Sequence, residues 1–353
     1  MTPRSRIRPA LAALLLAAVA GGAHAQSERR SVAGNSVAIY DIAGAVRVEA
    51  GSGNDVVVEV TRGGRDAAKL DVEVGDLRGR NTFRVIFPST DIVYPALGRW
   101  SNSEFSTDRD GTWGGDRKWY NGRRVRVRGS GSGLEAWADL RILVPAGKSV
   151  EVDLGVGKLE ASNVKGDLHF AVASAHVDTR MTVGNLTIEA GSGGASVSDA
   201  SGGDLSVETG SGGVQVDGVS SRTCKLSTGS GGVTGGRVGC EELSLEAGSG
   251  SVRVSGVKAQ RIKAETGSGG VTLGLDAAPR DLKVEAGSGG VTVSLPASTG
   301  ADVEISTGSG GIESDFALTV DKFERHHVRG RIGDGAGRIR IDSGSGSVRL
   351  RKN

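Results

Sequence analysis

The chain has 353 residues, with 43 Lys and Arg against 41 Asp and Glu and a formal net charge of +2 at pH 7. A balance this close to zero excludes a polyelectrolyte and gives no support for nucleic-acid binding. Because 58 residues are Gly and only 4% are aromatic, the chain needs close, regular backbone stacking rather than a bulky core.

Residues 1–25 have the three parts of a secretory signal peptide. A basic start (residues 4–8) precedes a short apolar stretch (residues 10–20) and a small-x-small cleavage site (residues 23–25). We therefore predict cleavage after Ala25 and a mature chain that is periplasmic or secreted. The apolar stretch is too short for a permanent anchor, so we expect no membrane span after cleavage.

Residues 26–144 are predicted to form a less regular β region that caps the repeat after it. Within this region, residues 91–133 (the insertion) interrupt the pattern with an aromatic and basic composition. All four tryptophans of the chain lie between residues 100 and 137. Residues 91–115 are expected to be a long, mostly polar loop.

The insertion has two interpretations. Exposed Trp and Tyr stack on sugar rings, and Arg pairs with carboxylate or phosphate groups of envelope polysaccharides. The candidate ligand contacts are Trp100, Trp113, Trp119, Tyr120, Arg117, Arg123 and Arg124. Alternatively, the aromatics plug an open end of the repeat, and the stretch Arg124–Arg128 is a charged edge strand that resists aggregation.

The region from residue 145 to residue 353 repeats Gly-Ser-Gly-Gly, or Gly-Ser-Gly-Ser, at nearly constant spacing. The first four intervals are 19 residues each, followed by 20, 21 and 36. The tetrapeptide begins at Gly191, Gly210, Gly229, Gly248, Gly267, Gly287, Gly308 and Gly344. A fixed period of this length with a turn in each unit is typical of a solenoid.

Apolar and polar residues alternate on both sides of each turn, which predicts short strands. Leu205, Val207, Val214 and Val216 share one face in the unit around Gly210. Stacked units would pair each strand with its equivalents above and below. We predict an all-β fold, a parallel and right-handed β-solenoid with about ten coils of roughly 18–21 residues.

An acidic row and a serine row accompany the turns. Glu189, Glu208, Glu246, Glu265 and Glu285 precede the turn glycine by two positions, and Asp153 and Asp342 hold the same place at either end. Lysines two positions earlier favour a solvated charged face over a metal array, because calcium β-rolls use a nine-residue repeat that is absent here. The turn serines are expected to hydrogen-bond the local backbone.

The histidines and cysteines give weaker signals. His169, His176, His326 and His327 lack the spacing of a metal site and are expected at the surface. Cys224 occupies a core position, and Cys240 lies near a corner of the next coil, offset by three positions. The two either form a disulfide or stay as a buried thiol and an unpaired Cys240.

The residues from Val144 to Gly147 (Val-Pro-Ala-Gly), followed by repeated Leu-x-Val-Glu-x-Gly-Ser-Gly-Gly-Val-x-Val, resemble a family of exported bacterial proteins. These β-strand-repeat domains of unknown function are labelled "putative adhesin" and are related to head domains called GIN. The resemblance spans roughly residues 35–350. It implies a repetitive β fold, and it carries over no catalytic residue.

Three functions follow from these patterns. The leading hypothesis is a non-enzymatic, exported cell-envelope protein without cofactors, which binds or scaffolds through envelope polysaccharide or another envelope protein. The second is a polysaccharide-active β-helix enzyme with carboxylates in a groove across neighbouring coils. The third is a periplasmic envelope-stress accessory that works through a protein partner.

Overall fold

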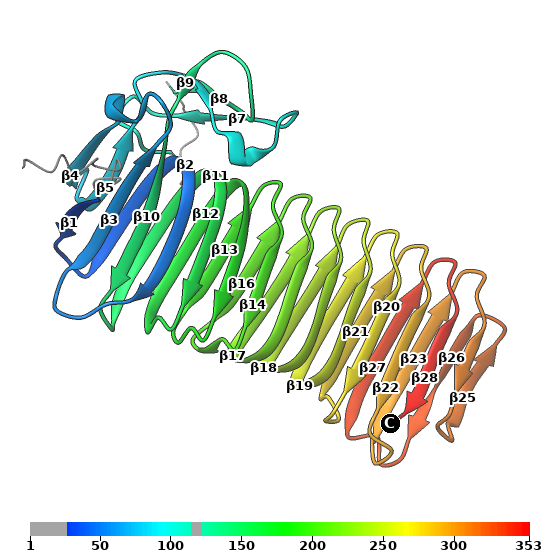
Figure 1. Ribbon diagram of the computed structural model, residues 1–353. Coiled ribbons are helices and arrows are strands. Elements are labelled where there is room, and N and C mark those ends of the chain that lie inside the picture. The colour runs from blue at the N-terminus through cyan, green and yellow to red at the C-terminus, as the bar shows by residue number, and fades with distance from the viewer. Residues whose placement is uncertain (1–26, 114–121) are drawn as a thin grey trace, which may run out of the picture.

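The structure is a computed structural model and describes residues 27–113 and 122–353. Figure 1 shows an elongated stack of strands with a small separate sheet beside its N-terminal end. The described residues contain two single 3-10 turns, η1 (Ala67–Lys69) and η2 (Pro95–Leu97). None of their helices is long and apolar enough to span a membrane. The predicted signal peptide lies outside the described residues.

The body of the stack consists of parallel strands, and each repeated Gly-Ser-Gly turn separates two consecutive strands. Its strands are β11 (Lys148–Ser162), β12 (Gly166–Arg180), β13 (Leu186–Ala190), β14 (Ala195–Ser198), β15 (Ser201–Gly202), β16 (Leu205–Thr209), β17 (Val214–Thr228), β18 (Val233–Ala247), β19 (Val252–Thr266), β20 (Val271–Leu275), β21 (Asp281–Ala286) and β22 (Val291–Leu295). Each coil pairs in register with the next, as β17 does with β18 and β18 with β19. The predicted all-β fold of many stacked parallel strands is therefore confirmed.

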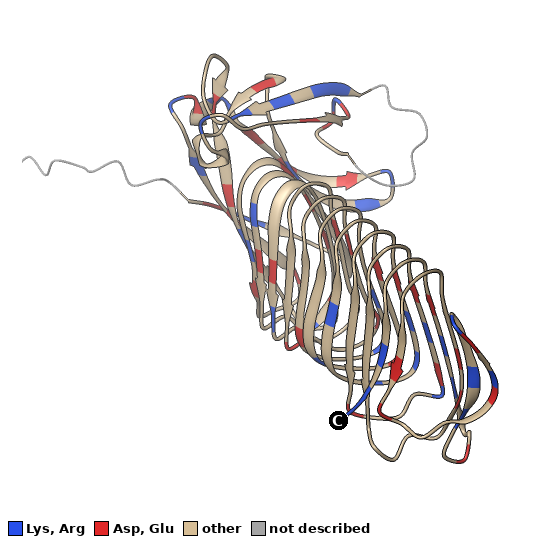
Figure 2. Cartoon of the chain, turned by 90° about the vertical axis from the view of Figure 1, so that its right-hand side faces the viewer, with Lys and Arg blue, Asp and Glu red and all other residues tan. Residues whose placement is uncertain are grey.

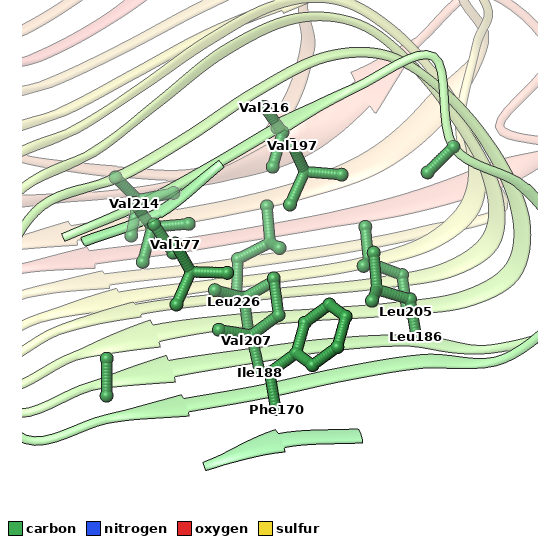
Figure 3. Close-up of a cluster of buried hydrophobic side chains, with 14 of the residues drawn as sticks. Phe170, Val177, Leu186, Ile188, Val197, Leu205, Val207, Val214, Val216 and Leu226 are labelled. Atoms are coloured by element: carbon green, nitrogen blue, oxygen red, sulfur yellow. The ribbon is translucent and has the colours of Figure 1, made fainter. Parts of the chain in front are cut away.

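The core is a set of apolar ladders along the stack axis. In one of them, Phe170, Ile188, Val207 and Leu226 occupy equivalent positions of four successive coils. All four side chains are fully buried, and Figure 3 shows them one above another with the ladder of Leu186 and Leu205 beside them. Because each ladder position meets its own equivalents, side chains of similar size recur at the repeat period.

The corners of the stack need glycine for close approach. A side-chain carbon at Gly250 would lie well inside van der Waals contact of the carbonyl oxygen of Gly231 in the coil below. Backbone hydrogen bonds connect the same corners, since the Ser211 amide donates to Gly191 O at 3.1 Å and the Ser230 amide to Gly210 O at 3.1 Å. The turn glycines thus allow neighbouring coils to pair through their corners.

Threonine ties several of the corners, and the prediction that the turn serines do this is wrong. Thr266 Oγ1 donates to Gly250 O at 2.9 Å and accepts from the Gly269 amide at 3.0 Å. Thr228 makes the same two kinds of bond, to Gly212 O and from the Gly231 amide. All eight turn serines are described and exposed, and of these only Ser309 donates a side-chain hydrogen bond to the protein. The buried position immediately before the turn is therefore the one that can reach backbone groups inside the corner.

The N-terminal end of the stack continues through strands from residues 28–144. They are β1 (Glu28–Val32), β2 (Ser36–Ala50), β3 (Val56–Gly63), β4 (Asp71–Leu77), β5 (Arg80–Ile86) and β10 (Trp137–Val144). β2 pairs in parallel with β11 along almost its whole length, so the ladder extends to the N-terminal side of residue 145. Beyond β2 lie β5 and β10, and antiparallel β4, β3 and β1 complete this end.

The C-terminal coils are not stacked in sequence order. They comprise β23 (Ala301–Thr307), β24 (Ile312–Ser314), β25 (Thr319–Glu324), β26 (His327–Ile332), β27 (Gly337–Ser343) and β28 (Val348–Lys352). β27 lies between β21 and β23, and β28 lies between β22 and β24. The final coil of the chain is therefore inserted beneath the coil that precedes it. The antiparallel hairpin β25–β26 then covers β23.

Candidate ligand-binding surface on the insertion

The described part of the insertion contributes to a small four-stranded sheet, so the prediction of a long loop over residues 91–115 is wrong. The sheet has the order β7 (Asn102–Thr107), β8 (Arg123–Arg128), β6 (Asp91–Val93), β9 (Leu134–Glu135). Val125 and Val127 of β8 are buried. Alternation along a strand therefore places Arg124, Arg126 and Arg128 on the opposite face of the sheet.

The sheet contacts the side of the stack through aromatic and hydroxyl groups. The ring of Phe105 occupies the space that a side chain at Gly155 would need. Ser103 Oγ lies 2.8 Å from Ser174 Oγ on β12. Trp113 packs on Phe105 with ring centroids 5.2 Å apart, and Trp137 packs on Tyr94 at 5.9 Å. Glycine in the corner at residue 155 thus makes room for the aromatic contact.

These positions do not support the capping interpretation of the insertion. Among the described strands, the neighbours of β2 at the N-terminal end are β5 and β10, not strands of the insertion. Arg124–Arg128 is not a charged edge either, because β8 lies between β7 and β6. The insertion lies beside the corners of the first coils (Figure 1).

The structure separates the sequence-predicted contact residues into two groups. Trp100 is 89% exposed, and the Arg99 guanidinium lies 5.4 Å from its ring centroid. The Arg124 side chain is 78% exposed. In contrast, Trp113 is half-buried against Phe105, and Arg123 donates to Phe87 O at 3.2 Å. Trp119, Tyr120 and Arg117 lie outside the described residues.

The arginine face of the insertion retains positive charge. Arg126 hydrogen-bonds Glu104, and Arg124 lies 3.8 Å from the same carboxylate. Arg128 lies 3.6 Å from Asp91. The hydrogen bond from Arg126 lowers the pKa of Glu104, so this carboxylate stays ionised. Three guanidinium groups therefore face two carboxylates; in Figure 2, β8 is the blue-banded strand that adjoins the grey trace.

The acidic row follows the stack, with the C-terminal coils out of sequence order. Glu246, Glu265, Glu285 and Asp342 are consecutive neighbours and line a groove of about 720 Å³. Lys263 Nζ lies 2.7 Å from Glu265, and Lys283 Nζ lies 2.6 Å from Glu285. Asp153 departs from the row, since it is only 1% exposed.

The burial of two carboxyl groups at the first coils was not predicted from the sequence, which placed Asp153 in the solvated acidic row and did not single out Asp41. Asp41 and Asp153 are each 1% exposed, and burial raises the pKa of both. Asp41 is the register partner of Leu154, which lies immediately before the corner at residues 155–157. Deeper in the stack, the equivalent position holds threonine or alanine. Only the register between coils reveals that the Asp41 side chain points inward.

The histidines do not converge. His169 Nε2 lies 3.6 Å from a Glu189 oxygen, and His176 Nε2 lies 3.5 Å from Ser196 Oγ. His327 Nδ1 is 3.2 Å from Ser306 Oγ, in the C-terminal hairpin at the other end of the stack. The described residues hold no group of three or more His, Cys, Asp or Glu side chains that could bind a metal ion.

Cys224 and Cys240 form a disulfide in the structure. Cys240 pairs in register with Ser221, three residues before Cys224. This is the offset read from the sequence, and the two Cα atoms are nonetheless 6.2 Å apart, within the range that a disulfide spans. The bridge connects adjacent coils in the middle of the stack.

The chain is similar to one protein family and, at low identity, to two solved structures. The family described as "Toastrack DUF4097" matches residues 135–351. A solved structure from Parabacteroides merdae ATCC 43184, titled "putative adhesin", is 10% identical, with a TM-score of 0.39 over 92% of this chain and 95% of that one. Another from Clostridium sporogenes ATCC 15579, titled "putative cell adhesion protein", is 11% identical, with a TM-score of 0.24 over 93% and 99%. No curated protein matches the chain.

Proposed function

The chain belongs to the Toastrack DUF4097 family, and we propose that it is a non-enzymatic, exported envelope protein that binds an anionic polysaccharide through its insertion. The observation that carries the proposal is the arginine face of the small sheet, where Arg124 of β8 is exposed, together with the exposed Trp100 in the turn before β7. Arginine pairs with carboxylate groups in a bidentate manner, and an exposed indole stacks on a sugar ring. An adhesin-like role in the periplasm or outside the cell is part of the same proposal.

The stack serves this function as a rigid support. Paired coils and buried ladders leave little freedom in the body, and the contacts of Phe105 and Ser103 attach the insertion to it. We also infer that the stack is right-handed with about ten coils, because parallel crossovers default to that hand. The division into a signal peptide (residues 1–25), an N-terminal region (26–144) and a repeat region (145–353) belongs to the same inference.

A carboxyl pair near the insertion does not favour the enzyme alternative. Glu151 forms an ion pair with Arg80, whereas burial raises the pKa of the neighbouring Asp153. Two neighbouring carboxyl groups that differ in this way in their tendency to ionise are typical of acid–base pairs. A polymer substrate would have to reach both groups. Because Asp153 is buried in the first coils, it cannot meet a glycosidic bond without local opening.

Binding of the purified mature chain to alginate, a polyuronate, tests the proposal, with uncharged dextran as the control polymer. We expect the Trp100→Ala, Arg124→Ala double variant to lose about tenfold in affinity, equal to about 1.4 kcal/mol. The matched control is the Met181→Ala, Arg253→Ala double variant, which removes an exposed apolar side chain and an exposed arginine in the body of the stack. Equal affinity of the two double variants, or equal binding to dextran, would contradict the proposal.

A further inference from the structure

The C-terminal end of the stack finishes in an open strand edge. β25 lies at the far end of the molecule (Figure 1) and pairs with β26 on one side. In the pairing registers of residues 27–113 and 122–353, no other strand pairs with its second side. All six residues of β25 are exposed. A free edge of this kind is a template for pairing with another strand.

Two large apolar side chains of β25 face the same side of the sheet. Val320 is 45% exposed and Phe323 is 77% exposed. Their register partners on β26 are Gly330 and Val328, which are both buried. Because cross-strand partners share a face, Val320 and Phe323 both point toward the inner side of the stack. No further coil covers them at this end.

A bulge between Val320 and Lys322 produces this arrangement. It leaves Asp321 on the outer face, where it lines a cavity of about 420 Å³ together with Asp302 and Arg331. From Thr319 to Glu324 the faces are outer, inner, outer, outer, inner, outer. The bulge makes this order of faces the same when read from either end of the strand. In a strand of six residues without a bulge, the faces would alternate, and the order would be reversed when read from the other end.

The symmetry of this pattern matters because opposite residues in an antiparallel pair must share a face. With a two-fold axis between Asp321 and Lys322, Thr319 lies opposite Glu324 of a second copy, Val320 opposite Phe323, and Asp321 opposite Lys322. Every pair then joins residues of the same face. The apolar side chains meet each other, and two opposite-charge pairs form across the axis.

We propose that β25 pairs with β25 of a second copy of this chain, which joins two stacks end to end through their C-terminal hairpins. The pairing is isologous, so it closes after two chains and leaves no C-terminal edge free for fibre growth. The N-terminal edge strand β4 fits β25 less well. Its charged residues are Asp71, Glu73 and Asp76, all acidic, and a head-to-tail contact would not close.

Sedimentation velocity of the mature chain over a concentration series tests this interface. We expect the wild type to dimerise with a dissociation constant in the micromolar range, because a six-residue strand pair is a small interface. Lys322→Glu places like charges opposite each other twice, and we expect at least a tenfold weaker dimer. The double exchange Asp321→Lys, Lys322→Glu restores both opposite-charge pairs, and we expect it to restore dimerisation.

Two further variants separate the interface from a folding defect. Val320→Lys should abolish the dimer through the apolar contact, whereas Lys258→Glu, an exposed lysine in the body of the stack, should leave it unchanged. Circular dichroism checks that each variant is folded. A wild type that stays monomeric at about 100 μM, or a dimer that Lys322→Glu and Val320→Lys both leave unchanged, would overturn the proposal. Alginate binding by Trp100 and Arg124 does not depend on either outcome.

Discussion

The body of the stack and the insertion obey different rules. In the body, the position of a residue within the repeat determines its environment, because each coil packs on a copy of itself. Val207 and Leu226 are both buried, since both are in the same ladder. In the insertion, Trp100 and Trp113 both lie among polar residues and glycine in the sequence. The Trp100 side chain is nevertheless exposed, whereas Trp113 packs on Phe105. The burial of a residue can therefore be predicted from the sequence where the structure repeats. It cannot be predicted in this way where the contacts are not repeated.

The largest effect is expected where the stack departs from sequence order. Removal of residues 337–353 takes away β27 and β28, which connect β21 and β22 with β23 and β24. We expect the thermal midpoint to fall by roughly 10 °C or more and trypsin to cleave within residues 296–335. If the final coil were only an outer layer, the midpoint would stay close to that of the full chain.

The disulfide tests how far the body depends on a non-repeated bond. Cys240→Ala leaves Cys224 in the core and opens a loop with a sequence separation of 16. We expect a loss of about 3 kcal/mol in the free energy of unfolding, measured with urea. A reducing agent should produce the same loss in the wild type and no change in the variant. Equal stability of the oxidised wild type and the variant would show that the bridge contributes nothing.

The corner glycines test whether close contact between adjacent coils determines which residue the body of the stack accepts at a position. We expect Gly250→Ala to cost about 1–3 kcal/mol, because the added carbon overlaps Gly231 O of the adjacent coil. Gly311→Ala is the control, since nothing lies within 4 Å of its new carbon. Urea unfolding of both variants measures the difference. Similar costs at the two positions would mean that backbone freedom, not contact between coils, explains the glycines.

A comparison of threonine with serine in the same corner should give a smaller effect. Thr266→Val keeps the shape but removes the hydrogen bonds to Gly250 O and from the Gly269 amide. We expect it to cost about 1–2 kcal/mol. Ser268→Ala removes an exposed hydroxyl and should change stability by less than about 0.5 kcal/mol. The reverse order would restore the serine to the structural role predicted from the sequence.

The smallest global effect is expected in the insertion. Phe105→Ala removes the ring that lies against Gly155. Since the Phe105 ring is only half-buried, we expect the unfolding free energy to change by less than about 1 kcal/mol. Amide hydrogen exchange in β7 and β8 should accelerate, while exchange in β17 and β18 stays as in the wild type. Faster exchange throughout would mean that the two regions unfold together.

Much of the fold was predictable because glycine, alternating valine and leucine, and a fixed period all describe the same coil. The disulfide was left open because three residues of offset are compatible with bonded and unbonded cysteines. The insertion was misread as a loop because its strands pair with residues far away in the chain, such as Asp91 with Arg126. Among the four candidate ligand contacts that the structure describes, the exposure of the side chains distinguishes Trp100 and Arg124 from Trp113 and Arg123.

The sequence by itself determined the repeat, its core ladders and the family, since these depend on local alternation and on spacing that every coil shares. The tertiary structure decided the order of the last coils, the inward position of Asp41, the burial of Asp153 on the outer face, and the side of the stack on which the insertion lies. These features depend on pairing between distant segments. The register between two paired strands determines which residues become neighbours. The sequence of one strand alone does not determine that register.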